Sequence, residues 1–281
     1  MLIDKPAGWT SHDVVAVVRR QLGTRAVGHA GTLDPFATGL LVVLVGKATR
    51  LARFAEGMRK TYDAVVQFGR ATNTDDADGI VVREQTPAVW PDDAAIDAAL
   101  ATLTGTQEQR PPAFSAKHVD GVRSYALARR GEAVDLPPVT VQVHELQRTA
   151  WSPPLLSLHA EVGRGTYVRA LARDLGERIG TPAHCATLRR TAIGPFLVGD
   201  ACAPEHAAAD RLIAPAALVP ALPREVLDAA AVREVVHGRR VAQQQLTAGV
   251  GALLGDDGRL VAAAEGRDGW WHPTVVLEPV P

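Results

Sequence analysis

Hydrophobic and polar positions follow two different periods along this chain. Between residues 61 and 68, apolar side chains occupy every second position, which predicts a strand with one buried face. A continuous apolar run predicts a strand at 40–45, and further strands are expected at 2–3, 139–146, 155–162 and 187–193. Helical spacing predicts helices at 12–22, 93–103 and 167–179, each followed by a glycine that ends it. Ser11 is the expected N-cap of the first helix.

The pattern changes near residue 215. A stretch rich in Pro and Ala, 215–223, is followed by one short helical pattern at 229–237. Short strand patterns then appear around 251–254, 260–265 and 274–277, and turn signals separate them. We therefore predict a larger domain over residues 1–215 and a small β-rich domain over residues 223–281.

Composition fits a soluble globular protein of the cytoplasm. The 281 residues are 47% hydrophobic and 22% charged, which can support a sizeable packed core. No apolar run is long enough to span a bilayer, and the N-terminus lacks the apolar stretch of a signal peptide. Two distant cysteines, Cys185 and Cys202, form neither a disulfide framework nor a zinc-like spacing.

Charge is distributed unevenly although the formal net charge is only −1. Residues 1–70 carry a net charge of +5 and residues 111–200 carry +3. The segments between and after them, 71–110 and 201–281, carry −6 and −3. Local charge is what phosphate groups experience, so the two basic segments permit a nucleic-acid partner. Scattered arginines on a solvated surface would give the same counts.

The run 28–39 is the best candidate for chemistry. It places one acid, Asp34, in a glycine-rich turn, with His29 five residues earlier and Pro35 directly after it. Pro35 fixes its own φ and disfavours helix at Asp34, so the loop can present a carboxylate to a large ligand. Taken alone, Asp-Pro is also a common turn former with no further role.

Motifs for cofactors and metals are missing from the sequence. There is no phosphate-binding P-loop, no dinucleotide fingerprint and no Gly-x-Ser-x-Gly elbow. The acidic segment 73–79 resembles a calcium loop, but Thr74 and Gln85 stand where the first and last carboxylates belong. No His-x-x-x-His pair occurs. We therefore predict an activity without cofactor or metal.

Six motifs occur in an order and at spacings that resemble one known family. They are similar to the TruB family of bacterial tRNA pseudouridine synthases, which modify the T-loop uridine at position 55, and the actinobacterial members look closest. The resemblance covers about residues 2–200 and is weaker beyond. The motifs are Lys5-Pro6-x-Gly8-x-Thr10-Ser11, Gly28-His29-x-Gly31-Thr32-Leu33-Asp34-Pro35, Lys60-x-Tyr62, Thr74-Asp75-x-Ala77-Asp78-Gly79, Gly165-Thr166-Tyr167-x-Arg169 and Leu188-Arg189-Arg190.

The resemblance implies a fold and a partner. The fold is α+β, with a mixed, mostly antiparallel central sheet, flanking helices and a small C-terminal β domain of PUA type. The partner is the T arm of tRNA, bound by a monomer without a membrane or protein partner. Residues 111–131 match the family's RNA-gripping loop. Ala30 and Asn73 depart from the family pattern, and the sequence starts almost on the first motif. These departures concern RNA affinity rather than the reaction.

The resemblance also implies site residues. Asp34 matches the catalytic aspartate, Arg169 its arginine partner, and Tyr62 a tyrosine that packs on the target base and can transfer a proton. Without the resemblance, Tyr62 could be plain core and Arg169 a surface arginine. Further positions match substrate contacts, with Lys5 part of a structural pair beside the site: His29, Tyr167, Leu188, Lys5, Arg129 and Arg130.

The chemistry suits these residue types. Pseudouridine formation breaks the N1–C1′ bond, turns the base and joins C5 to C1′, with no net oxidation. An ionised aspartate can attack C1′, attack C6 or assist an elimination, and the sequence leaves the three routes open. Two other functions remain, a non-catalytic tRNA-binding protein and a glycosidase. The second usually needs paired carboxylates, and only Asp34 stands out.

Overall fold

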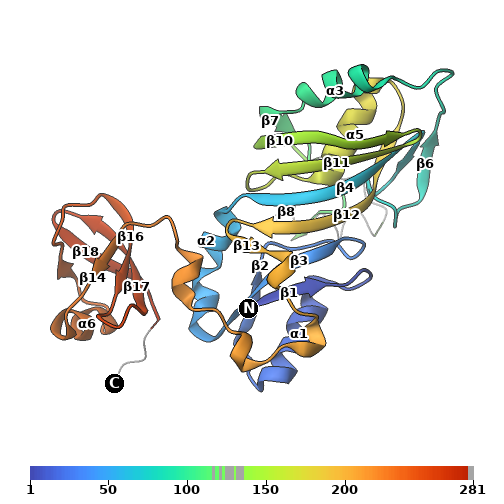
Figure 1. Ribbon diagram of the computed structural model, residues 1–281. Helices are drawn as coiled ribbons and strands as arrows, with labels where there is room; N and C mark the ends of the chain where they lie inside the picture. The colour runs from blue at the N-terminus through green and yellow to red at the C-terminus, as the bar shows by residue number, and fades with distance from the viewer. Residues whose placement is uncertain (116–117, 120–121, 124–129, 131–135, 278–281) are drawn as a thin grey trace.

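The computed structural model describes residues 1–115, 118–119, 122–123, 130 and 136–277. Its main sheet has nine strands, and its principal path runs β1-β3-β12-β4-β11-β10-β7 (Figure 1). Neighbouring strands on this path are antiparallel except for β3 and β12, which confirms a mixed, mostly antiparallel sheet. The strands of the path are β1 (Leu2–Lys5), β3 (Thr38–Val45), β12 (Ala183–Ile193), β4 (Lys60–Phe68), β11 (Leu155–Val162), β10 (Val139–Ser152) and β7 (Gly105–Gln109). β2 (Val27–Ala30) pairs with β3, and β13 (Phe196–Leu197) pairs with β12.

The parallel contact between β3 and β12 depends on one glycine. Gly39 pairs with Arg190 and has a φ of 102°, a conformation that favours glycine. A Cβ there would lie 2.3 Å from the Arg190 carbonyl oxygen. Strand β12, which carries Leu188 and Arg190, can therefore lie directly beside the end of the Asp34 loop.

Helices cover the sheet in two separate cores. α3 (Asp93–Ala101) and α5 (Val168–Ile179) pack over β4, β10, β11 and β12 and bury the larger apolar cluster. α1 (Ser11–Leu22) packs against β1, β2 and β3 in a second cluster. The short α2 (Ala52–Gly57) follows a 3₁₀ turn, η1 (Gly46–Leu51). No helix among the described residues is long and apolar enough to cross a membrane.

The N-cap of α1 is Thr10, not Ser11 as the sequence predicted. Thr10 and Asp13 form a reciprocal capping box, in which each side chain bonds the other residue's backbone N–H. Ser11 is the first helical residue, and its hydroxyl turns away to Leu33. A capping box gives hydrogen-bond acceptors to two backbone N–H groups at the helix start, so it stabilises the helix more than a single serine cap does.

Other predicted elements differ mainly at their ends. α3 ends at Ala101, β10 extends to Ser152 and β12 begins at Ala183. The acidic segment 73–79 is the predicted loop, but it joins a hairpin of β5 (Arg70–Thr72) and β6 (Val81–Glu84) that the pattern did not reveal. Within the predicted RNA-gripping loop, β8 (His118–Val119) pairs with β9 (Val122–Arg123), and Arg129 lies outside the described residues.

A second sheet follows a linker built from four 3₁₀ turns, η2 (Val198–Asp200), η3 (Pro204–His206), η4 (Ala209–Arg211) and η5 (Pro215–Leu218). Its strand order is β14-β16-β17-β18-β15, with α6 (Ala229–Val236) packed against it. The strands are β14 (Arg224–Val226), β15 (Val241–Ala242), β16 (Gly249–Leu254), β17 (Leu260–Arg267) and β18 (Trp270–Val276). Side chains of this sheet share one apolar cluster with η1 and α2, and Arg50 donates to the Val276 carbonyl at 2.9 Å. The two sheets are therefore joined by a packed interface.

Candidate active site

A cavity of about 890 Å³ opens where the loop after β2, the strands β4 and β12 and the start of α5 meet. Five residues predicted from the sequence line it, from four different segments of the chain: Asp34, Tyr62, Tyr167, Arg169 and Leu188. The fold thus brings together side chains that lie up to 154 positions apart in the sequence. A cavity of this size can enclose a small ligand or one nucleotide.

Hydrogen bonds from the first residue of α1 and from the segment that precedes α1 hold the Asp34 loop in place. Ser11 donates to the Leu33 carbonyl at 3.2 Å and accepts from the Leu33 amide at 3.0 Å. The Gly8 amide donates to the Pro35 carbonyl at 2.8 Å. Backbone groups on both sides of Asp34 are therefore satisfied, which leaves its carboxylate free to point into the cavity.

Two buried cations support the same loop. The Lys5 ammonium donates to the carbonyls of Trp9 at 2.7 Å and Pro35 at 3.2 Å, and also to Pro6. Arg190, on β12, donates to the carbonyls of Leu40 at 2.7 Å and Gly31 at 2.9 Å. Burial lowers the pKa of Lys5 to about 8, and the negative charge of Asp34 opposes this shift. Lys5 is fully buried and outside the cavity lining, so it supports the loop where the sequence predicted a substrate contact.

Asp34 forms a two-point ion pair with Arg169 of α5. The Arg169 Nε lies 2.9 Å from Asp34 Oδ2, and its Nη2 donates to Oδ1 at 3.0 Å. The Arg169 side chain is only 3% exposed, whereas that of Asp34 is 33% exposed. The guanidinium stabilises the negative charge of the carboxylate, and the exposed edge of the carboxylate remains available to a ligand.

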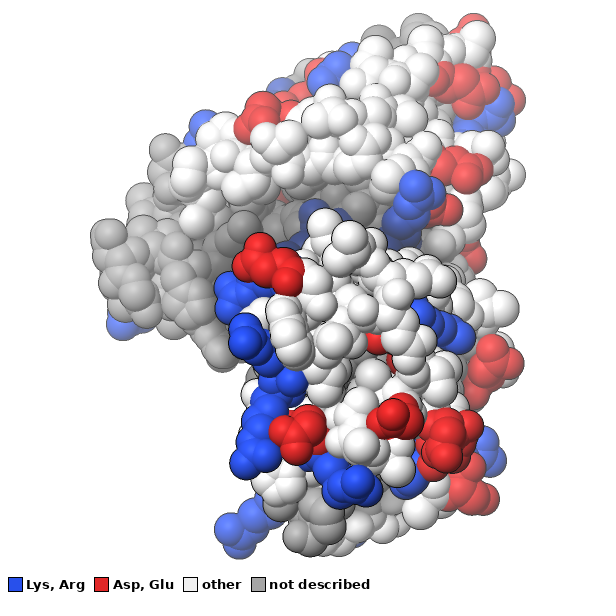
Figure 2. All heavy atoms as spheres, turned by 90° about the vertical axis from the view of Figure 1, so that its left-hand side faces the viewer, with Lys and Arg blue, Asp and Glu red and all other residues white. Residues whose placement is uncertain are grey.

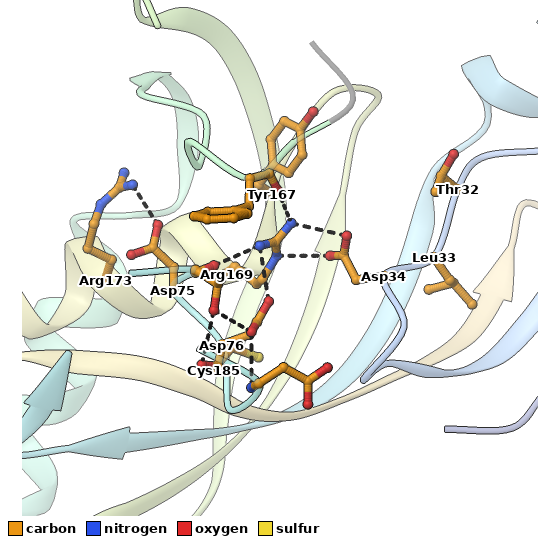
Figure 3. Close-up of polar contacts among 12 residues, drawn as sticks. Thr32, Leu33, Asp34, Asp75, Asp76, Tyr167, Arg169, Arg173 and Cys185 are labelled. Atoms are coloured by element: carbon orange, nitrogen blue, oxygen red, sulfur yellow. Dashed lines mark hydrogen bonds and ion pairs between the residues drawn. The ribbon is translucent and has the colours of Figure 1, made fainter. Parts of the chain in front are cut away.

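Asp76 is a second carboxylate on Arg169, and sequence reasoning missed it. Its Oδ2 lies 3.1 Å from Nη1, opposite Asp34, and its side chain is 7% exposed (Figure 3). Burial raises the pKa of Asp76, while the Thr74 hydroxyl, 2.6 Å from its Oδ1, and then Arg169 oppose the shift. Asp76 occupies the unassigned position of its motif. The sequence feature that could have indicated it is the acidic segment 73–79, because a carboxylate of such a segment needs a cationic partner when it is buried.

Two backbone carbonyls complete the surroundings of Arg169. Nη1 donates to the Thr74 carbonyl at 2.7 Å, and Nη2 donates to the Phe114 carbonyl at 2.9 Å. Phe114 belongs to the beginning of the predicted RNA-gripping loop. One guanidinium therefore connects the Asp34 loop, the acidic segment 73–79 and the beginning of residues 111–131.

Two tyrosines and a leucine supply the apolar walls. Tyr62 of β4 and Leu188 of β12 are each 7% exposed and line the cavity. Tyr167 precedes α5, and the Gln109 side chain holds its backbone by bonds of 2.9 Å to its N–H and 3.1 Å to its carbonyl. Burial raises the pKa of the Tyr167 phenol, and the neighbouring Ser115 hydroxyl opposes this shift. The arrangement presents aromatic surface beside a carboxylate.

His29 lies behind the cavity rather than in its lining. Its ring packs edge-on against His12, which does line the cavity, with 5.7 Å between ring centroids. The Nδ1 atom of His29 is buried and has no hydrogen-bond partner among the described residues. Burial lowers the pKa of His29 to about 4, and the charges of His12 and Arg190 contribute to the shift. Of the two loop arginines, Arg130 is exposed and Arg129 lies outside the described residues.

Two carboxylates of the acidic segment are paired with arginines. Asp75 pairs with Arg173 at 2.9 Å, and Asp76 pairs with Arg169. Within the part of the chain that the structure describes, no group of three or more His, Cys, Asp or Glu is arranged to hold a metal ion.

Comparisons with known proteins agree with one another. A family model described as the N-terminal domain of TruB family pseudouridylate synthases matches residues 19–168. A "tRNA pseudouridine synthase B" of Thermobifida fusca is 46% identical over 287 residues, covering 99% of this chain and 97% of the relative. Proteins of the same name from Arthrobacter sp. and Synechococcus sp. are 41% and 42% identical, each covering 99% of this chain and 96% of the relative.

Solved structures show the same fold at lower identity. The archaeal box H/ACA sRNP Nop10-Cbf5 complex contains a chain with a TM-score of 0.74 and 22% identity, covering 99% of this chain and 86% of that one. A chain of a Cbf5-Nop10-Gar1 complex has a TM-score of 0.75 and 24% identity, covering 99% and 85%. These likenesses span both sheets and confirm the α+β fold class.

The low pKa of His29 predicts a pH dependence of stability. In the unfolded chain His29 takes up a proton near its ordinary value of about 6.5, but in the folded chain only near 4. Between these values the unfolded state binds more protons, so this residue makes stability fall as the pH is lowered. The difference in unfolding free energy between the wild type and His29→Asn should change across this window in urea titrations. The exposed His206→Asn is the control, and equal slopes for both variants would contradict the pKa shift.

Proposed function

Because the chain belongs to the TruB family of pseudouridylate synthases, we propose that it converts a uridine of tRNA to pseudouridine, at position 55 in the T loop. The names of its full-length relatives support tRNA as the substrate. The observation that carries the proposal is the Asp34–Arg169 ion pair at the wall of a cavity that two tyrosines line. The oligomeric state, a monomer, stays a prediction.

The reaction is an isomerisation that the chain's own residues can perform. The N1–C1′ bond breaks, the base turns, C5 joins C1′, C5 loses its proton and N1 gains one. The Asp34 carboxylate supplies the negative charge or the nucleophile that every route through C1′ or C6 requires. Arg169 stabilises that charge before and during the reaction, because its own position is fixed by Asp76 and two carbonyls.

Tyr62, Tyr167 and Leu188 form the proposed base-binding walls. A uridine inside a folded loop must leave its stack, at a cost of a few kcal/mol, and an aromatic pocket offsets part of that cost. Tyr62 lies on the strand beside β12, so its ring and the Leu188 side chain can hold the base from one side. The Tyr62 hydroxyl is the proposed group for moving the proton between C5 and solvent.

Positive charge near the cavity supports contact with the RNA backbone. Figure 2 shows Lys and Arg gathered in a column along one edge of the face that carries the C-terminal sheet, beside a hollow. At the cavity itself, Arg164 is the exposed cation, whereas Lys60 and Arg190 line the cavity but are buried and donate to backbone carbonyls. Phosphate contacts of this kind position a nucleic acid without reading its sequence.

We assign catalysis to residues 1–215 and additional RNA contacts to a PUA-like domain over residues 223–281. The described residues that line the cavity all lie in the first range. In the second, Arg240 lies over the Trp270 ring at 4.5 Å from its centroid, a pair of the kind that contacts nucleic acids. We assign to His29, which packs against His12, a role in holding the T loop of the RNA rather than the reacting base.

Asp34→Asn tests the activity directly. The substitution is nearly isosteric, so the loop and tRNA binding should persist while the charge and the nucleophile are lost. With enzyme in excess over an unmodified tRNA transcript, the single-turnover rate should fall by about 10⁴ or more. Asp63→Asn is the matched control, because Asp63 lies on the same strand as Tyr62 but is 59% exposed and pairs with His159.

The outcomes separate the possible functions. Pseudouridine formed by the wild type at one position, and not by Asp34→Asn, supports the proposal. Binding of tRNA without isomerisation would indicate a non-catalytic tRNA-binding protein, and release of free base would indicate a glycosidase.

Tyr62→Phe separates stacking from proton transfer. The ring stays and only the hydroxyl is removed, so tRNA affinity should remain near that of the wild type. If the hydroxyl moves a proton, the chemical step should slow by about 10²–10⁴. A rate constant close to that of the wild type would leave Tyr62 with stacking alone.

A further inference from the structure

We propose that the ion pair between Asp75 and Arg173 is a positioning pair for this reaction: it fixes the acidic segment 73–79 so that Asp76 holds Arg169 against Asp34. The proposal rests on the proposed function. Neither residue lines the cavity, so neither is placed to contact a base bound there. Asp75 and Arg173 lie beside the Asp34–Arg169–Asp76 cluster in Figure 3.

The two arginines are matched in position and in partners. Arg169 and Arg173 lie four residues apart, which places them on one face of α5, one turn from each other. Each guanidinium contacts the same two segments. Arg169 binds Asp76 and the Phe114 carbonyl, and Arg173 binds Asp75 at 2.9 Å and the Arg110 carbonyl at 2.8 Å. Of the two, only Arg169 is paired with Asp34.

The backbone of Asp75 explains how neighbouring carboxylates reach different arginines. Asp75 has a φ of 59°, in the left-handed region that few residues other than glycine adopt. Its carbonyl accepts from the Cys185 amide at 3.0 Å, so the segment is also fixed to β12. This conformation turns the Asp75 and Asp76 side chains to successive turns of α5. It is costly for a residue other than glycine and persists where its surroundings enforce it.

The charge of Arg173 stabilises the conformation in which the Asp75 carboxylate is buried. The Asp75 and Arg173 side chains are 15% and 23% exposed. Burial raises the pKa of Asp75, and the charge of Arg173 is the largest effect that opposes the shift. Asp174 also binds Arg173, at 2.7 Å, and orients the guanidinium from its own helix. Without Arg173 the Asp75 carboxylate loses its paired counter-charge and keeps only the weaker effect of the Arg169 charge, so we expect the segment to rearrange.

Arg173→Gln, Asp75→Asn and the double variant test the proposal in the full-length protein with an unmodified tRNA transcript. Each single substitution should lower the single-turnover rate constant by about 10- to 100-fold, the effect of a small misplacement of catalytic groups. The tRNA affinity should change by less than about twofold, because no cavity residue is altered. The double variant should be no slower than the slower single variant, because both substitutions remove the same pair.

Control variants show whether the rate falls because the acidic segment is misplaced or only because a positive charge or stability is lost. Arg178→Gln removes an exposed arginine from the same helix and should leave the rate unchanged. Arg173→Lys keeps the charge near Asp75 and should restore part of the rate. The acid limb of the pH–rate profile should move to higher pH in Arg173→Gln, because Arg169 would oppose the burial-raised pKa of Asp76 less strongly.

The effect of Arg173 on Asp76 can also be measured without substrate. Titration of the Asp76 carboxyl by carbon-13 NMR should shift in Arg173→Gln and stay unchanged in Arg178→Gln. Unaltered rates, profiles and titration in folded Arg173→Gln and Asp75→Asn would overturn the proposal. So would a loss of rate that follows thermal stability alone and disappears at lower temperature. An inactive wild type would instead overturn the proposed function, and the titration would still decide whether Arg173 acts on the cluster.

Discussion

The buried charge of Arg169 is the constraint on which the rest of the site depends. A guanidinium that is 3% exposed must be paired and hydrogen-bonded, because leaving it unpaired away from water costs several kcal/mol. Its partners come from three segments that are far apart in the chain: the Asp34 carboxylate, the Asp76 carboxylate with the Thr74 carbonyl, and the Phe114 carbonyl. Satisfying one side chain therefore fixes the mutual position of all three segments.

The two carboxylates on Arg169 differ in their access to the cavity. Asp34 is 33% exposed and Asp76 only 7%, although both lie about 3 Å from the same guanidinium. Asp76 can stabilise the arginine throughout a reaction, whereas Asp34 can form new bonds on its exposed side. The loop that carries Asp34 is supported separately by Lys5 and Arg190, whose donors reach carbonyls on both sides of it. The site is thus organised before a substrate binds, as electrostatic catalysis requires.

Periodicity predicted the main strands and helices of this chain, because one face of each is buried and the sequence records that burial. The hairpin of β5 and β6 was not predicted, because β6 has no buried face. All four residues of β6 are exposed, so no alternation marks it. The pairing of Asp34 with Arg169, 135 positions apart, followed from the resemblance to a family and not from spacing. The structural place of Lys5 beside the site also followed from the resemblance. Asp76 and the carbonyls that Lys5 binds required the structure, since both depend on which groups the fold buries together.

Arg169→Lys tests most directly whether one planar, multiply bonded cation organises the site. Lysine keeps the positive charge but offers a single point charge, which cannot serve Asp34, Asp76 and two carbonyls at once. Under single-turnover conditions, pseudouridine formation in a tRNA transcript should slow by about 10² or more, while the dissociation constant for tRNA stays within a few-fold of the wild type. A rate constant close to that of the wild type would show that charge alone suffices, and would contradict the central role of the Arg169 geometry.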